Sequence, residues 1–257
     1  MNSSVAVAVI ASFTAVVVSF VGAGLNLWAA GRTRRHQTLD IVARYRDPLL
    51  WAAFDLRSRL FNIVASDFLR HSYEAGEEER QYAQSSTLYV VAEFLGWAEI
   101  LRRGVQFLDL GDVARNRQLV ELFHRIDRSF STLQLEDPAL RLHRGQQRAI
   151  GELMISSARS TAGTGSECIG YATFCARLER DAEFERWFTR LRADIDDLAG
   201  RDPQATRTDR LVDLQNRLMD LIDFLDPQTV RFPSRRRERL YQVWPVPAGD
   251  RRTTESV

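Results

Sequence analysis

Residues 5–30 read VAVAVIASFTAVVVSFVGAGLNLWAA and contain no charged residue. Three arginines, Arg32, Arg34 and Arg35, follow directly. At about 1.5 Å per residue, an α-helix of this stretch is roughly 39 Å long, which exceeds the hydrocarbon core of a bilayer, about 30 Å. The stretch therefore predicts one transmembrane helix that contacts the lipid bilayer, within an anchor segment 1–31.

The charges on the two sides of the predicted span are asymmetric. No Arg or Lys precedes residue 5, whereas Arg32, Arg34 and Arg35 follow the span. Because basic flanks stay in the cytoplasm, we expect a single-pass protein of the cell membrane with its N-terminus outside and its C-terminal domain cytoplasmic. The same arginines are expected to contact anionic lipid. A cleaved signal peptide is the alternative, but its basic residues would precede the apolar core.

Small side chains recur at every fourth position of the predicted span. They lie on one helical face, which would allow two spans to approach closely, so the pattern is compatible with a homodimer. The alternative is that alanine is simply common in apolar helices. The residues of this face are Ala11, Ala15, Ser19 and Ala23.

The part of the chain after the anchor is nearly neutral and large enough for a folded domain. Beyond residue 35 there are 32 basic and 34 acidic residues, and every basic residue is an arginine. Such a balance lacks the overall positive charge that is typical of nucleic-acid-binding proteins, so we expect no nucleic-acid partner. More than 200 residues remain, which suffices for one large or two small domains with a hydrophobic core.

Helical periodicity recurs in every long apolar segment after the anchor. This pattern predicts an all-α fold, in which one N-terminal transmembrane helix precedes a cytoplasmic bundle of about seven helices. Asp47-Pro48 resembles a helix start, with Asp as the cap and Pro in the first turn. We therefore expect a juxtamembrane helix over 32–47, a helical domain over 48–228 and an Arg-rich flexible tail over 229–257.

The clearest periodic pattern is in the last predicted helix. Its leucines alternate steps of three and four residues, as in a coiled coil, but over less than three heptads. We therefore expect this helix to close a bundle within the chain rather than to pair with a partner. The leucines are Leu211, Leu214, Leu218, Leu221 and Leu225.

Two glutamates interrupt the apolar segment 81–103. A buried carboxylate with a raised pKa can serve as a general acid, but it can also hold an arginine of a neighbouring helix. For Glu99 the default interpretation is an ion pair with Arg103, four residues later on the same helix. Whether Glu93 and Glu99 are functional or structural stays open at this point.

The candidate binding site lies over residues 143–152, the densest polar stretch beside an apolar run. Arg144 and Arg148 share one helical face that Glu152 continues, and together with His143 they could line an anion-binding pocket. The alternative is a surface ladder in which Arg148 pairs with Glu152.

The sequence contains no recognisable catalytic or metal-binding motif. We find no nucleophile–base pair and no cluster of metal ligands, and the glycine-rich stretch 160–166 lacks the lysine of a phosphate-binding loop. Cys168 and Cys175 are too few for a zinc site. We therefore expect no metal and no cofactor, and the sequence does not establish that the protein is an enzyme.

Two classes of function follow from these features. The first is a membrane-anchored interaction or scaffold protein with a protein partner. The second is a membrane-tethered sensor or hydrolase, whose anion-binding site is assembled from residues distant in sequence.

The chain also resembles single-pass membrane proteins of actinobacteria whose function is unknown. The resemblance rests on the N-terminal anchor, on the run DPLLW at 47–51 and on the core QRAIGE at 147–152. It implies the same anchored arrangement, and it implies no activity, ligand or catalytic residue.

Overall fold

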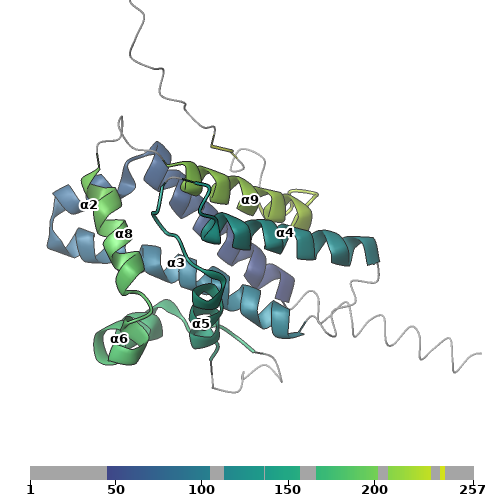
Figure 1. The fold of residues 1–257 in the computed structure, drawn as a ribbon, viewed down its shortest axis with the longest axis horizontal. Helices are drawn as coiled ribbons and strands as arrows, with labels where there is room; N and C mark the ends of the chain where they lie inside the picture. Colours follow the sequence, from purple (N-terminus) through teal and green to yellow (C-terminus); the bar gives the residue numbers. More distant parts are fainter. Residues whose placement is uncertain are drawn as a thin grey trace, which may run out of the picture.

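The computed structural model describes residues 45–104, 113–135, 137–156, 166–201, 208–232 and 238–240. These residues form helices and no β-strand, apart from one isolated bridge between Ile155 and Cys168, so the predicted all-α fold is confirmed (Figure 1). The helices are residues 45–65, α2 (Phe68–Ala75), α3 (Glu77–Gly104), α4 (Val113–Ser131), α5 (Arg144–Met154), α6 (Tyr171–Arg180), α7 (Ala182–Glu185), α8 (Thr189–Gly200) and α9 (Asp209–Leu225).

The predicted transmembrane helix, residues 5–30, lies outside the described residues, as do the small-residue face within it and the arginines that follow. Among the helices that the structure does describe, none combines the length and the apolar character needed to cross a membrane.

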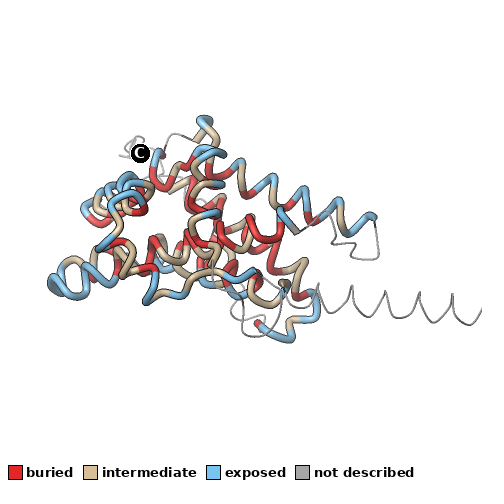
Figure 2. Tube along the Cα trace, turned by 90° about the horizontal axis from the view of Figure 1, so that it is seen from below, coloured by how far each residue is buried: buried red, intermediate tan, exposed pale blue. Residues whose placement is uncertain are grey.

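Helix α3 is the centre of the fold. It contacts α2, α5, α6 and α8, and it is the longest helix in the described part of the chain, with 28 residues. Buried residues lie on the sides of the helices that face one another (Figure 2), and their apolar side chains form one hydrophobic core. The remaining helices are therefore held by their contacts with α3 or with each other.

Two glycines allow α3 and α5 to approach closely. A Cβ atom placed on Gly151 of α5 would lie 2.6 Å from the main-chain oxygen of Leu95 and 2.9 Å from Cβ of Glu99. A Cβ atom on Gly96 of α3 would lie 2.8 Å from Cβ of Met154. Any side chain at these positions would force the two helices apart.

The structure corrects several predicted helix boundaries. The first described helix runs through Asp47-Pro48 without a break, so these residues do not start it. The acidic stretch 74–79 reads as a solvated loop in the sequence, but in the structure it is helical except at Gly76, which has a φ of 134°. The acidic residues Glu77 and Glu78 belong to the first turn of α3, where the helix dipole favours negative charge.

The apolar periodicity of residues 182–198 predicts one continuous helix, but the structure divides this segment into α7 and α8. The main-chain N–H groups of Trp187 and Phe188 bond to carbonyl groups three residues back, at 3.2 and 2.8 Å, which tightens the chain into a turn. This turn places Phe184 and Phe188 against Phe174, with ring centroids 5.6 and 5.2 Å apart. Aromatic packing with α6 therefore outweighs the continuous helical pattern of the sequence.

Helix α9 closes the bundle against α4, as its leucine pattern predicts. Leu211, Leu214, Leu218 and Leu221 are fully buried, and Leu225 is partly buried.

Beside these leucines, Arg210 is also fully buried, and its guanidinium group binds main-chain oxygens at the end of α4. It donates hydrogen bonds to the carbonyls of Ser129 (2.5 Å), Phe130 (3.2 Å), Thr132 (2.8 Å) and Asp137 (3.1 Å). Carbonyl groups at a helix C-terminus lack partners within the helix. Arg210 thus serves as a C-terminal cap supplied by another helix.

The chain after α9 folds back onto the first described helix. The Asp226 carboxylate accepts hydrogen bonds from the main-chain N–H groups of Val230, Arg231 and Phe232, at 2.9, 3.1 and 3.1 Å. This turn places the Phe232 ring on Phe54, with centroids 3.8 Å apart and planes within 3°.

Residues 238–240 lie along α9. The Gln215 side-chain amide donates to the Glu238 carbonyl (2.8 Å) and accepts from the Leu240 N–H group (3.1 Å), and the Arg57 guanidinium donates to the same Glu238 carbonyl. Arg239 forms ion pairs with two acidic residues of α9. Part of the segment that we expected to be a flexible tail, 229–257, therefore packs against the helices.

Candidate functional site

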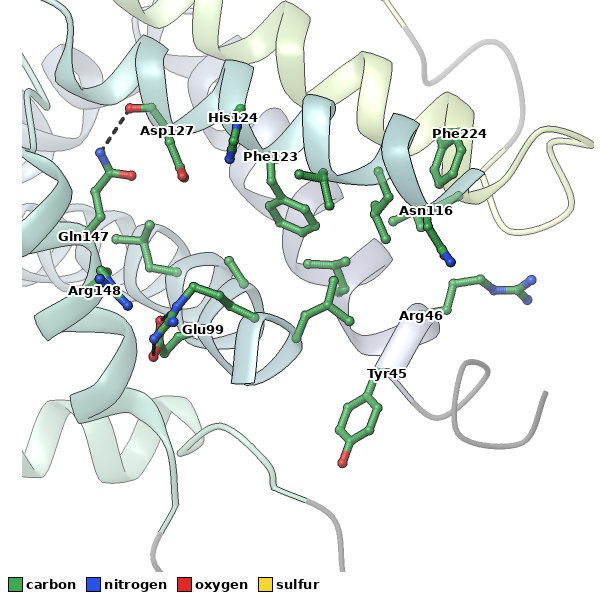
Figure 3. A pocket seen from close by; sticks show the side chains of 18 of the residues that line it. Tyr45, Arg46, Glu99, Asn116, Phe123, His124, Asp127, Gln147, Arg148 and Phe224 are labelled. Atoms are coloured by element: carbon green, nitrogen blue, oxygen red, sulfur yellow. Dashed lines mark hydrogen bonds and ion pairs between the residues drawn. The ribbon is translucent and has the colours of Figure 1, made fainter. Parts of the chain in front are cut away.

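A cleft of about 560 Å³ lies between the first described helix, α3, α4 and α5, and the C-terminal end of α9 (Figure 3). Small-molecule sites in proteins typically have volumes of about 300–1,000 Å³. The cleft is therefore large enough for a small ligand, and each of these elements contributes to its wall.

The inner wall of the cleft is apolar. Its side chains come from four elements that are distant in sequence, and several of them belong to the hydrophobic core. This wall favours a ligand with a hydrocarbon part. The apolar residues are Leu49, Leu95, Ala98, Leu101, Leu119, Val120, Phe123, Phe224 and Leu225.

The charged residues of the cleft are mostly arginines. The lining contains two carboxylates, those of Glu99 and Asp127, and five guanidinium groups. The electrostatic potential of the cleft is therefore positive. The arginines are Arg46, Arg102, Arg115, Arg144 and Arg148.

The start of α5 places two of these arginines one turn apart. The His143 N–H group donates to the side-chain oxygen of Gln146 (2.9 Å), so the helix begins at Arg144. The Gln147 side chain is buried and donates to the main-chain oxygens of Leu142 (2.9 Å) and Asp127 (3.1 Å). These bonds fix α5 against α4 and direct Arg144 and Arg148 towards the cleft.

Neither Arg144 nor Arg148 forms an ion pair or a side-chain hydrogen bond with the described residues. The pair expected between Arg148 and Glu152 is absent there, because Glu152 pairs with Arg103 of α3, at 2.9 Å. Both residues are exposed, so an anion can reach them. Their charge is thus available for a ligand.

Glu99 is neutralised within the protein. The glutamate is 3% exposed, and it accepts hydrogen bonds from Nε of Arg102 and Nε of Arg103, both at 2.7 Å. Burial favours the neutral acid, but these hydrogen bonds outweigh it and lower the pKa of Glu99. The predicted pair with Arg103 is confirmed, and Glu99 has a structural partner.

Asp127 differs from Glu99. Its side chain is half-buried and lines the cleft, but it makes no ion pair or hydrogen bond with the described residues. Burial raises the pKa of Asp127, and the nearby positive charges of Arg144 and His124 oppose that shift.

The structure brings only part of the predicted site together. Arg144 and Arg148 line the cleft, whereas His143 and Glu152 do not. Glu93 also lies outside the lining; it accepts a hydrogen bond from the Tyr89 hydroxyl (3.1 Å), and burial raises its pKa.

Sequence reasoning missed Asp127, His124 and Gln147 as parts of the site. His124 and Asp127 lie on α4, whereas Gln147 lies on α5. Only the packing of α4 on α5 brings these side chains into one cleft. The one available signal was that His124 flanks the apolar stripe of α4.

Neither a scan against models of protein families, nor a search of curated proteins, nor a search of solved structures finds a match to this chain. The resemblance to single-pass actinobacterial proteins therefore stays a prediction.

Proposed function

We propose that this protein binds a small amphiphilic anion in the cleft and that it acts as a membrane-tethered sensor of that ligand. The observation that carries the proposal is the combination of an apolar wall with two arginines, Arg144 and Arg148, that have no ion-pair partner among the described residues and line the same cleft. An alkyl chain matches the wall, and an anionic head group matches the guanidinium groups.

Of the two function classes considered above, the cleft supports the sensor over the scaffold. It also favours binding over hydrolysis, because the described residues that line it include no serine, threonine or cysteine that could serve as a nucleophile. Asp127 and His124, three residues apart on α4, provide polar groups to the cleft. No nucleophilic side chain lies beside them among the described lining residues.

The membrane part of the proposal rests on the sequence of residues 5–30 and on the arginines that follow. A span there would hold the cleft close to the bilayer, because Tyr45 and Arg46, which line the cleft, follow residue 30 by only about fifteen residues. We propose that the ligand is an amphiphile that partitions between the bilayer and the cytoplasm.

Replacing both Arg144 and Arg148 with glutamine is expected to weaken binding of decyl phosphate by at least about tenfold, because charge-assisted hydrogen bonds contribute about 1.5–3 kcal/mol each. The melting temperature without ligand should barely change, since both side chains are exposed. Calorimetry and thermal shift on the full chain in phosphatidylcholine nanodiscs measure the two quantities.

The matched control is the double variant Arg117→Gln and Arg128→Gln, which removes two exposed arginines of α4 that do not line the cleft. It should bind like the wild type. Inorganic phosphate and decanol, each lacking one half of the ligand, should bind weakly. A wild-type protein that binds none of these compounds would overturn the proposal and leave the scaffold function as the better hypothesis.

Topology can be tested separately from ligand binding. With Arg32, Arg34 and Arg35 on the cytoplasmic side, a reporter that is active only outside the cytoplasm should be silent when it is joined after residue 257. The same reporter joined before residue 1 should be active. The reverse pattern would show that the predicted orientation is wrong.

A further inference from the structure

One carboxylate of the cleft, that of Asp127, forms no ion pair or hydrogen bond with any other residue that the structure describes. Asp127 lies on α4, at the end of the cleft where Figure 3 also shows His124 and Arg148. Its backbone is held firmly, because its main-chain oxygen accepts hydrogen bonds from Gln147 (3.1 Å) and from the Ser131 hydroxyl (2.8 Å). These bonds fix the backbone of Asp127 in the wall of the cleft that Arg144 and Arg148 also line.

The contrast with Glu99 indicates what is unusual about Asp127. Both carboxylates line the same cleft, but Glu99 is bound by Arg102 and Arg103, and its charge is compensated. Asp127 forms no ion pair with the described residues, although Arg144 is close enough to act on its ionisation. A carboxylate left in this state is available to a ligand.

The charged groups that face this space come from four elements. On α4 they are His124 and Arg115, on α3 Glu99 and Arg102, on α5 Arg144 and Arg148, and on the first described helix Arg46. Two of them, Arg144 and His124, act on Asp127 and favour its charged form, whereas burial favours the neutral form and has the larger effect.

We propose that Asp127 determines which head group the cleft accepts: as a neutral acid it donates a hydrogen bond to an anionic oxygen of the ligand, and as a carboxylate it repels that oxygen. The proposal rests on the proposed function, because it needs the ligand's head group to lie at the Arg144–Arg148 end of the cleft. Selection of the head group would then depend on Asp127, although this residue contributes no positive charge to the cleft.

The direction of the pH dependence follows from the burial of Asp127. Its pKa is raised in the free protein, and a bound anion disfavours the charged form further, so that binding takes up a proton. Affinity for an anion should therefore increase as the pH falls towards the pKa of Asp127 and should be lowest where Asp127 is fully ionised.

The probe for the test is decyl sulfonate, whose single charge does not change across the pH range, so that only protein groups titrate. We expect wild-type affinity to rise about tenfold from about pH 8 to about pH 5. Asp127→Asn keeps the size and a hydrogen-bond donor. At about pH 8 this variant should bind about tenfold more tightly than the wild type, and it should lose most of the pH dependence.

Two further variants distinguish the effect of Asp127 on binding from the effects of neighbouring residues. His124→Gln removes the histidine that acts on Asp127 from the same helix, and it should retain most of the wild-type pH dependence. Glu121→Gln removes an exposed carboxylate of α4 that pairs with Arg125 outside the cleft, and it should bind like the wild type at every pH.

The outcomes distinguish the two proposals. If the wild type binds decyl sulfonate and Asp127→Asn shows the same affinity and the same pH dependence, Asp127 is not the selecting residue and only the present inference fails. A pH dependence that disappears in His124→Gln and persists in Asp127→Asn would assign the effect to the histidine and overturn the inference as well. If the wild type binds no decyl compound at any pH, the proposed function itself is wrong, and this inference fails with it.

Discussion

Replacing Arg210 with methionine is expected to lower the free energy of unfolding by about 3–5 kcal/mol. Methionine matches much of the volume of the fully buried side chain but donates no hydrogen bond. The carbonyl oxygens of Ser129, Phe130 and Thr132 would lose the guanidinium group that binds them at the end of α4. Each buried carbonyl without a partner costs about 1–3 kcal/mol, partly offset by relaxation of the chain and entry of water.

Urea unfolding of the full chain, followed by far-ultraviolet circular dichroism, measures this loss. Arg180→Met, at an exposed position near the end of α6, is the control and should change the stability by less than about 0.5 kcal/mol. Arg210→Lys should also be strongly destabilising, because one ammonium group cannot replace a planar fork that reaches several carbonyls. A loss below about 1 kcal/mol for Arg210→Met would show that the cap contributes little.

Replacing Gly151 with alanine is expected to destabilise the domain by about 1–3 kcal/mol. In an exposed helix this change would stabilise by up to about 1 kcal/mol, because alanine has the higher helix propensity. At Gly151 the new methyl group would lie 2.6 Å from the Leu95 carbonyl oxygen, a backbone atom that can move only with α3. The steric cost of separating the helices therefore outweighs the gain in propensity.

The same helix offers a matched control for this prediction. Gly145 lies in the first turn of α5, and apart from its chain neighbours and its own helix backbone, nothing lies within 4 Å of a Cβ placed there. Gly145→Ala should leave the stability unchanged or increase it slightly. Equal stability of the two variants would contradict the close contact between α3 and α5.

The helical fold could be predicted because apolar periodicity is visible within each short segment of the sequence. Apolar periodicity identifies which face of each segment is buried, and the leucines of α9 predict correctly that this helix packs within the bundle. Boundaries were less predictable where packing between distant elements decides them. The turn between α7 and α8 depends on the contact of Phe184 and Phe188 with Phe174, which no local pattern reveals.

The sequence could predict only those residues of the candidate site that lie close together on one helix. Arg144 and Arg148 could be named from their spacing of four residues, and both line the cleft. The pairing of Glu152 could not be inferred, because its partner, Arg103, belongs to a helix about fifty residues earlier. Asp127 could not be identified for the same reason, because its position close to Arg144 depends on how α4 packs on α5.

The docking of residues 238–240 onto α9 has a practical consequence for anyone who shortens this chain. The helical domain expected from the sequence ends at residue 228, and a fragment cut there would lose the Phe232 ring that stacks on Phe54. It would also lose the Glu238 carbonyl that the Arg57 and Gln215 side chains share, although both side chains are buried. A fragment intended for crystallisation or spectroscopy should therefore extend at least to residue 240, well beyond the last helix.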